Sequence, residues 1–75
     1  MDLTVEQTEL LFEATEIFLA WYKKYNVEYP TFSELLQINH TKILDIFEGD
    51  IYSEEDVTNT LINLKDNYLR LFLEY

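Results

Sequence analysis

The chain has 75 residues, 48% of them hydrophobic, and a net charge of −10 from 15 acidic and 5 basic side chains. This length suffices for one domain at most, and the apolar content is too high for a disordered tail. The absence of cysteine excludes disulfides and thiolate metal sites, and the acidic balance argues against binding to nucleic acid or anionic lipid.

Capping signals and apolar spacing predict a first helix from about Val5 to Tyr25. Thr4 is suited to the N-cap, and Gln7 stands where it completes a capping box. Lys23 and Lys24 fall in the last turn, where positive charge suits the helix dipole. The apolar residues that recur at three- and four-residue steps should face the core; they are Leu11, Ala14, Phe18, Trp21 and Tyr25.

Two short helices are predicted after a linker that ends at Pro30. Thr31 caps the first, which runs from Phe32 to about Gln37, and Glu34 completes a capping box. Ile38 and Asn39 form a predicted turn. The next helix runs from about His40 to Phe47, and Gly49 ends it as a left-handed C-terminal residue.

The last predicted helix follows Ser53, which suits an N-cap, and extends to the end of the sequence. Its first turn holds Glu54, Glu55 and Asp56, where negative charge suits the dipole. Its main apolar stripe is Val57, Leu61, Leu64, Tyr68 and Leu71, and Ile62, Leu69, Phe72, Leu73 and Tyr75 widen it. Apolar residues never alternate with period two, so we expect one all-α domain over residues 1–75, a compact four-helix fold.

The stretch FSELLQINHTKILDIFEG, residues 32–49, has the spacing of a helix-turn-helix. Ser33 is the small residue of the first helix, Ile38 is the apolar residue after the turn, and Ile43, Ile46 and Phe47 fall at or beside buried positions. Gln37 stands where glycine is preferred. With the capped helix downstream, residues 32–64 resemble the helix-turn-helix of the phage-repressor and Cro type.

That resemblance implies a DNA-binding transcriptional regulator whose recognition helix presents Asn39, His40, Thr41 and Lys42 to DNA. Asp45 and Glu48 fall on the same helix and would repel the phosphates. A simpler interpretation makes Asn39 or Thr41 a helix cap and pairs Lys42 with a nearby acid. On charge grounds we favour that interpretation and regard nucleic acid as a disfavoured partner.

No catalytic or metal-binding pattern is present in the sequence. His40 is the single histidine, and a lone histidine near a helix start is commonly a surface residue. Glu9, Glu13 and Glu16 line one helical face without the Glu-x-x-His motifs of a di-metal site. We therefore expect no enzyme activity, no metal and no cofactor.

The cellular location is predicted from the amino-terminal residues and from the length of the apolar runs. The first ten residues, MDLTVEQTEL, lack a basic segment followed by an apolar one, and Ile17 to Tyr22 is too short a run to span a bilayer. We expect a cytoplasmic protein without membrane contact.

The function we expect is regulation by protein–protein binding. Six tyrosines, five phenylalanines and one tryptophan exceed what a small core encloses, so some should form a tyrosine-rich surface. The acidic surface would dock on a basic partner, as an inhibitor or as a DNA-mimic anti-repressor. We also expect the end of the last helix to contact a second copy, as a homodimer, or a partner, and a purely structural subunit is a further alternative function. The expected partner-binding residues are Leu69, Leu71, Phe72, Leu73, Tyr75, Glu54, Glu55 and Asp56.

Overall fold

The first helix, α1, spans Val5–Lys24 and begins as the sequence predicts. The computed structural model describes residues 2–25, 28, 30–48 and 52–74. The Thr4 hydroxyl accepts from the Gln7 amide at 3.1 Å, and the Thr4 amide donates to the Gln7 carbonyl oxygen of the side chain at 3.0 Å. The predicted capping box is therefore confirmed. At the other end of the helix, Lys23 and Lys24 occupy the last turn.

The second helix, α2, is continuous over Phe32–Ile46, so the predicted turn at Ile38 and Asn39 is wrong. No glycine or proline stands within these residues, and nothing in the backbone chemistry requires a break. Asparagine leaves a helix when its side chain bonds its own backbone. Here the Asn39 side chain bonds to two other helices instead.

Capping also sets the starts of α2 and of the third helix, α3, which spans Glu54–Glu74. The Thr31 hydroxyl accepts from the Glu34 amide at 3.2 Å. Ser53 and Asp56 form a reciprocal pair, with 3.1 Å from the Asp56 amide to Ser53 Oγ and 3.2 Å from the Ser53 amide to Asp56 Oδ2. Both predicted N-caps are confirmed. The predicted capping box at Thr31 is not formed, because Glu34 Oε1 accepts from the Thr31 hydroxyl at 3.2 Å rather than from its amide. Gly49 lies outside the described residues.

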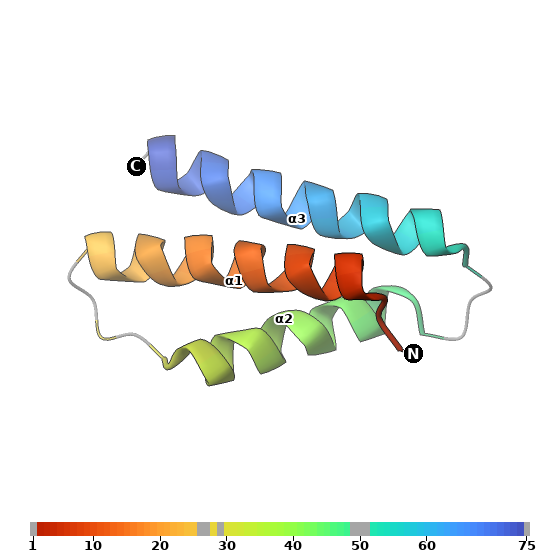
Figure 1. The fold of residues 1–75 in the computed structure, drawn as a ribbon. Helices are drawn as coiled ribbons and strands as arrows, with labels where there is room; N and C mark the ends of the chain where they lie inside the picture. Colours follow the sequence, from red (N-terminus) through yellow and green to blue (C-terminus); the bar gives the residue numbers. More distant parts are fainter. Residues whose placement is uncertain (1, 26–27, 29, 49–51, 75) are drawn as a thin grey trace.

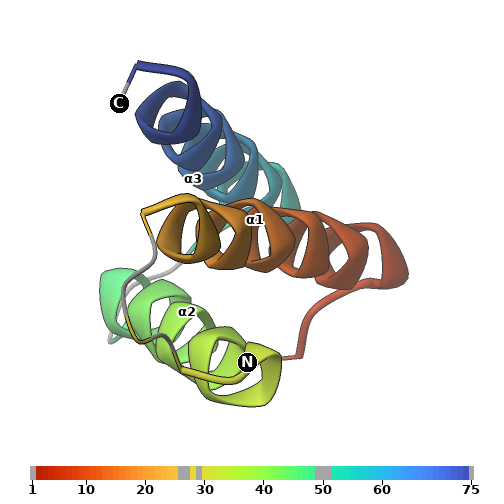
Figure 2. The ribbon, with the colours of Figure 1, turned by 90° about the vertical axis from the view of Figure 1, so that its left-hand side faces the viewer.

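The described chain therefore holds three helices rather than the four predicted, and no strand. Figure 1 shows that α1 and α3 run in the same direction and that α2 runs the opposite way. In Figure 2 α1 lies between α3 and α2. The molecule is elongated, about 40 Å by 22 Å by 21 Å. The all-α prediction is confirmed and the four-helix count is wrong.

Apolar side chains from all three helices form the core. Leu11, Ile43, Val57 and Leu61 are buried together, and Leu36, Phe47 and Leu64 pack against them. Burial of side chains of this size contributes about 1.5–3 kcal/mol each. Ile38 and Ile46 are 53% and 51% exposed, so these two members of the helix-turn-helix pattern do not enter the core.

A chain of buried hydrogen bonds crosses the core beside these apolar residues. The Tyr68 hydroxyl of α3 donates to Asn39 Oδ1 of α2 at 2.6 Å, and Asn39 Nδ2 donates to Thr15 Oγ1 of α1 at 3.0 Å. The Thr15 hydroxyl donates in turn to the Leu11 carbonyl at 2.8 Å. Asn39 and Thr15 are both fully buried. One polar network thus joins the three helices.

Candidate protein interface

Carboxylates gather at the end of the molecule where α1 and α3 begin and α2 ends (Figure 1). We call this the acidic end. Its carboxylates are all exposed: Asp2, Glu6, Asp45, Glu48, Glu54, Glu55 and Asp56. Lys23 and Lys24 lie at the opposite end, in the last turn of α1. The fold thus brings seven of the 15 acidic residues, from separate parts of the sequence, to one end of the molecule.

Helix dipoles account for only part of this placement. Glu6 lies in the first turn of α1, and Glu54, Glu55 and Asp56 lie in the first turn of α3, where negative charge stabilises a helix. Asp45 lies in the last turn of α2, which has no basic residue, and Glu48 follows that helix. Negative charge there opposes the dipole. Helix stability therefore does not explain Asp45 and Glu48.

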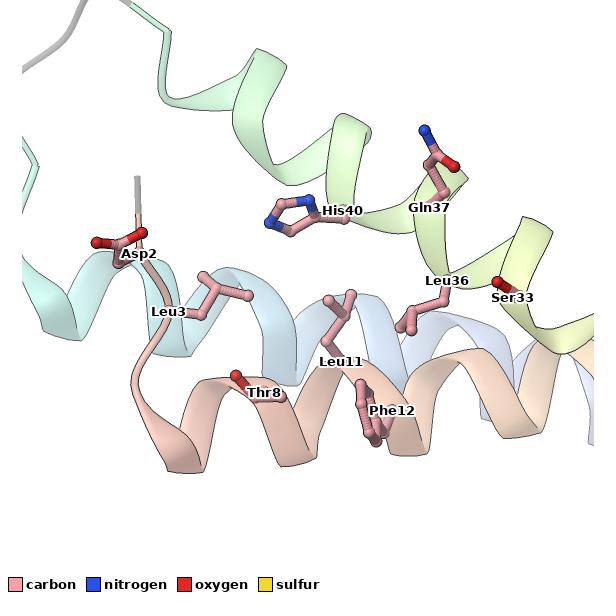
Figure 3. Close-up of a pocket in the computed structure, with 9 residues that line it drawn as sticks. All are labelled: Asp2, Leu3, Thr8, Leu11, Phe12, Ser33, Leu36, Gln37 and His40. Carbon is pink, nitrogen blue, oxygen red and sulfur yellow. The ribbon is translucent and has the colours of Figure 1, made fainter.

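A groove between α1 and α2 opens beside the acidic end (Figure 3). Its volume is about 770 Å³. Leu3, Leu11, Phe12 and Leu36 supply its apolar surface. Its polar lining consists of Asp2, Thr8, Ser33, Gln37 and His40, so it contains one carboxylate and neither lysine nor arginine.

Phe12 is the most exposed apolar side chain among the groove residues, at 43%. Its ring meets the edge of Phe32 at a centroid distance of 6.0 Å and an interplanar angle of 87°. An edge contact of this kind orients both rings. The groove was not predicted from the sequence, although Phe12 stands off the apolar stripe of its helix between Glu9 and Glu16.

The four residues predicted for DNA contact do not share one surface. Asn39 is fully buried in the polar network, and His40 is half-buried and lines the groove. Thr41 is on the outer side of α2 beside Glu34 and Ile38. Lys42 lies with Nζ 6.0 Å from the centre of the Tyr68 ring. Successive residues of a continuous helix point about 100° apart, which separates them.

The predicted partner-binding residues lie at two ends of α3. Leu69 and Leu73 are 41% and 69% exposed, whereas Leu71 and Phe72 are half-buried. Tyr75 lies outside the described residues. The Leu69–Leu73 segment and the Glu54–Asp56 cluster are separated by most of a 21-residue helix, which corresponds to roughly 20 Å at 1.5 Å per residue. They therefore form two surfaces rather than one.

Exposed apolar residues continue along α3 from the first of these surfaces. Ile62, Leu69 and Leu73 are 39%, 41% and 69% exposed, and their spacing of seven and four residues places them on one helical face. We call them the α3 stripe. A stripe of this kind is a candidate contact for a second molecule.

The tyrosines are less exposed than the sequence suggested. Tyr68 is buried, with its ring stacked on Phe18 at a centroid distance of 4.3 Å. Burial raises the pKa of Tyr68, and the nearby Tyr22 raises that pKa further. Tyr22 and Tyr52 are half-buried, and Tyr25 is 36% exposed. Among the described residues, the acidic surface is therefore not rich in tyrosine.

Metal-binding clusters and membrane-spanning helices are both absent from the described residues. Within them, no group of three or more acidic, histidine or cysteine side chains is placed to hold a metal ion. No helix in the same part of the chain has the length and apolar character needed to cross a bilayer.

The comparisons with known proteins give no relative. The chain matches no protein-family model, and neither the curated proteins nor the solved structures contain a significant match. The resemblance of residues 32–64 to phage repressors therefore stays a prediction.

Proposed function

We propose that this protein is a small acidic regulator that acts by binding the basic surface of another protein. The observation that carries the proposal is the acidic end, where helix directions bring together carboxylates from all three helices. Clustered charge of one sign steers a partner of opposite charge and raises its association rate. The charge at Asp45 and Glu48 opposes the α2 dipole, which supports a role in binding over a role in stability.

One version of this function is inhibition of a nucleic-acid-binding protein by mimicry of phosphates. The carboxylates of the acidic end would occupy the basic surface that otherwise binds DNA. A partner isolated from the native host would then lose DNA as the acidic protein is added. A partner that binds DNA and the acidic protein together would exclude mimicry while leaving protein binding in place.

The test of the acidic end compares two double variants with equal net charge. Glu54→Gln with Glu55→Gln, and Glu28→Gln with Glu74→Gln, each remove two of the 15 acids, so both change the net charge from −10 to −8. We expect the first pair to weaken binding to the isolated partner and to reduce its salt dependence, because those carboxylates belong to the acidic end. Equal effects from both pairs would show that only net charge matters and would contradict the proposal.

The second candidate function, a repressor-type DNA-binding regulator, has less support. Asn39 is buried, Lys42 lies against Tyr68, and five basic residues leave few cations for phosphate contacts. We expect no binding to random DNA, or to DNA from the protein's own upstream region, in an anisotropy titration at low salt. Tight, sequence-selective binding that Lys42→Glu abolishes would replace the proposed function with this one.

A further inference from the structure

We infer that the groove between α1 and α2 is a docking site for an amphipathic helix that carries lysine or arginine on its polar face. The inference rests on the proposed function and names the segment of the partner that is bound. Helix-in-groove binding places apolar side chains at three- and four-residue steps into an apolar channel. The groove supplies the apolar channel, and the acidic end supplies the charge.

The shape of the groove suits a helix. It follows the space between two antiparallel helices, and Figure 3 shows Leu3, Leu11 and Leu36 facing this space with Phe12 at one edge. In that view α3 runs behind the groove, so the front of the α1–α2 pair is uncovered. The side chains of a third helix pack into the channel between two neighbours.

Burial of the exposed part of Phe12 would contribute to the binding free energy of a docked helix. The side chain is 43% exposed, although Phe32 holds its ring from one side. Covering apolar surface contributes about 25 cal/mol per Å², and aromatic residues in such positions are often the strongest anchors of an interface. Phe12 is therefore the residue on which an apolar side chain of the docked helix should rest.

Charge around the groove selects a basic helix. Asp2 belongs to the lining, and Glu9 and Glu16 stand three residues before and four residues after Phe12, next to it on the same flank of α1. The nearby cations are engaged elsewhere: Lys65 pairs with Glu13, and Lys42 lies against Tyr68. An acidic helix would meet the carboxylates of Asp2, Glu9 and Glu16, whereas a basic helix would meet opposite charge there.

Charge disfavours a second copy of this chain as the occupant of the same groove. Each copy carries a net charge of −10, and α1 and α3 both begin with acids. Bringing two acidic ends together costs free energy through like-charge repulsion. The occupant is therefore a different, basic protein.

The experiment uses the full chain and three fluorescent 18-residue peptides as probes. The first is a leucine–lysine helix with leucines at three- and four-residue steps. The second has the same composition in a scrambled order without an apolar face. The third replaces every lysine with glutamate. We expect the first peptide to bind more tightly than the other two by at least about tenfold, which is about 1.4 kcal/mol.

Variants of the protein locate the bound peptide. Phe12→Ser should weaken binding of the leucine–lysine peptide by about tenfold, because it removes an anchor. Gln37→Lys, which places a positive charge in the lining of the groove, should also weaken binding of this peptide. Ile62→Ser is the matched control, because Ile62 is 39% exposed on α3 whereas Phe12 is 43% exposed in the groove. The ring proton signals of His40 should shift on binding, since His40 lines the groove.

The possible results separate this inference from the proposed function. Equal binding of the ordered and scrambled peptides, or indifference to Phe12→Ser, overturns the groove and leaves an acidic docking surface. Equal binding of the lysine and glutamate peptides with sensitivity to Phe12→Ser retains the groove and overturns the selection by charge. No binding of any peptide overturns the inference, and the paired variants of Glu54 and Glu55 then test the proposed function separately.

Discussion

Asn39 illustrates how a single side chain ties the three helices together. Its carbonyl oxygen accepts from Tyr68 and its amide nitrogen donates to Thr15, while no part of the residue is exposed. A buried polar group without a partner costs about 1–3 kcal/mol. The observed packing satisfies this amide by bringing Thr15 of α1 and Tyr68 of α3 within hydrogen-bond distance of it, so the network favours this packing of the helices.

Tyr68→Phe should lower the free energy of unfolding by about 1–3 kcal/mol, because it leaves Asn39 Oδ1 buried without its donor. Urea denaturation followed by circular dichroism measures this change. Tyr52→Phe is the control, since Tyr52 is half-buried and its ring, which packs on Phe47, is kept. Equal small losses in both variants would contradict the importance of the Tyr68 hydrogen bond.

Tyr68 should also make stability depend on alkaline pH. Burial raises the pKa of Tyr68 in the folded protein above its ordinary value of about 10, so the folded state holds the proton more strongly than the unfolded state. This contribution is fully present below about pH 10 and is lost as pH rises through the folded pKa. Unfolding free energies from pH 8 to 11 should therefore fall more steeply in the native chain than in Tyr68→Phe. Parallel curves would contradict the raised pKa.

At the scale of the helix, substitutions at Gln37 test whether α2 is continuous or contains the turn of a helix-turn-helix. Gln37→Gly should destabilise the protein by about 0.8–1.0 kcal/mol relative to Gln37→Ala, because glycine is unfavourable within a helix. Gln37 is exposed, so neither change disturbs the core. Chemical denaturation of the two variants measures the difference. A glycine variant as stable as the alanine variant would indicate the left-handed turn of the repressor pattern.

The helix starts were predictable from sequence because capping is local. Thr4, Thr31 and Ser53 each bond an amide three residues ahead, and the sequence itself contains both partners. The continuity of α2 was not predictable in this way. The sequence pattern placed a turn at Asn39, and the bonds that its side chain makes instead reach residues 24 and 29 positions away in sequence.

The candidate site was predictable in charge and not in shape. Counting residues gives the acidic balance, and the first-turn acids of α3 were identified at Glu54, Glu55 and Asp56. Their proximity to Asp45 and Glu48 follows from the direction of α2, which the sequence pattern did not specify. The groove likewise needs Leu3, which precedes α1, and Leu36 of α2 to line the same space.

At the scale of the whole molecule, the α3 stripe and the net charge act in opposite directions on self-association. Apolar contact through Ile62, Leu69 and Leu73 favours a dimer, and a charge of −10 on each copy opposes it. We expect sedimentation at micromolar concentration to show dimer that increases with salt, because the Debye length falls to about 3 Å at 1 M.

Leu73→Glu should abolish that dimer, because it places a charge on the most exposed residue of the α3 stripe. Phe12→Ser is the control and should leave the dimer unchanged. Binding of a partner to the acidic end should instead weaken as the salt concentration rises. A chain that stays monomeric at every salt concentration would refute the apolar contact.

The alternating directions of the three helices also place Asp2 and Glu74 far apart. Asp2 lies at the mouth of the groove, whereas Glu74 lies at the other end of a molecule about 40 Å long (Figure 1). A fluorophore, affinity tag or surface tether joined after residue 75 therefore leaves the groove accessible. The same attachment before residue 1 stands next to Leu3 and competes with any ligand there. Two fusion proteins that differ only in the end that is joined would thus report, without any substitution, which part of the molecule binds.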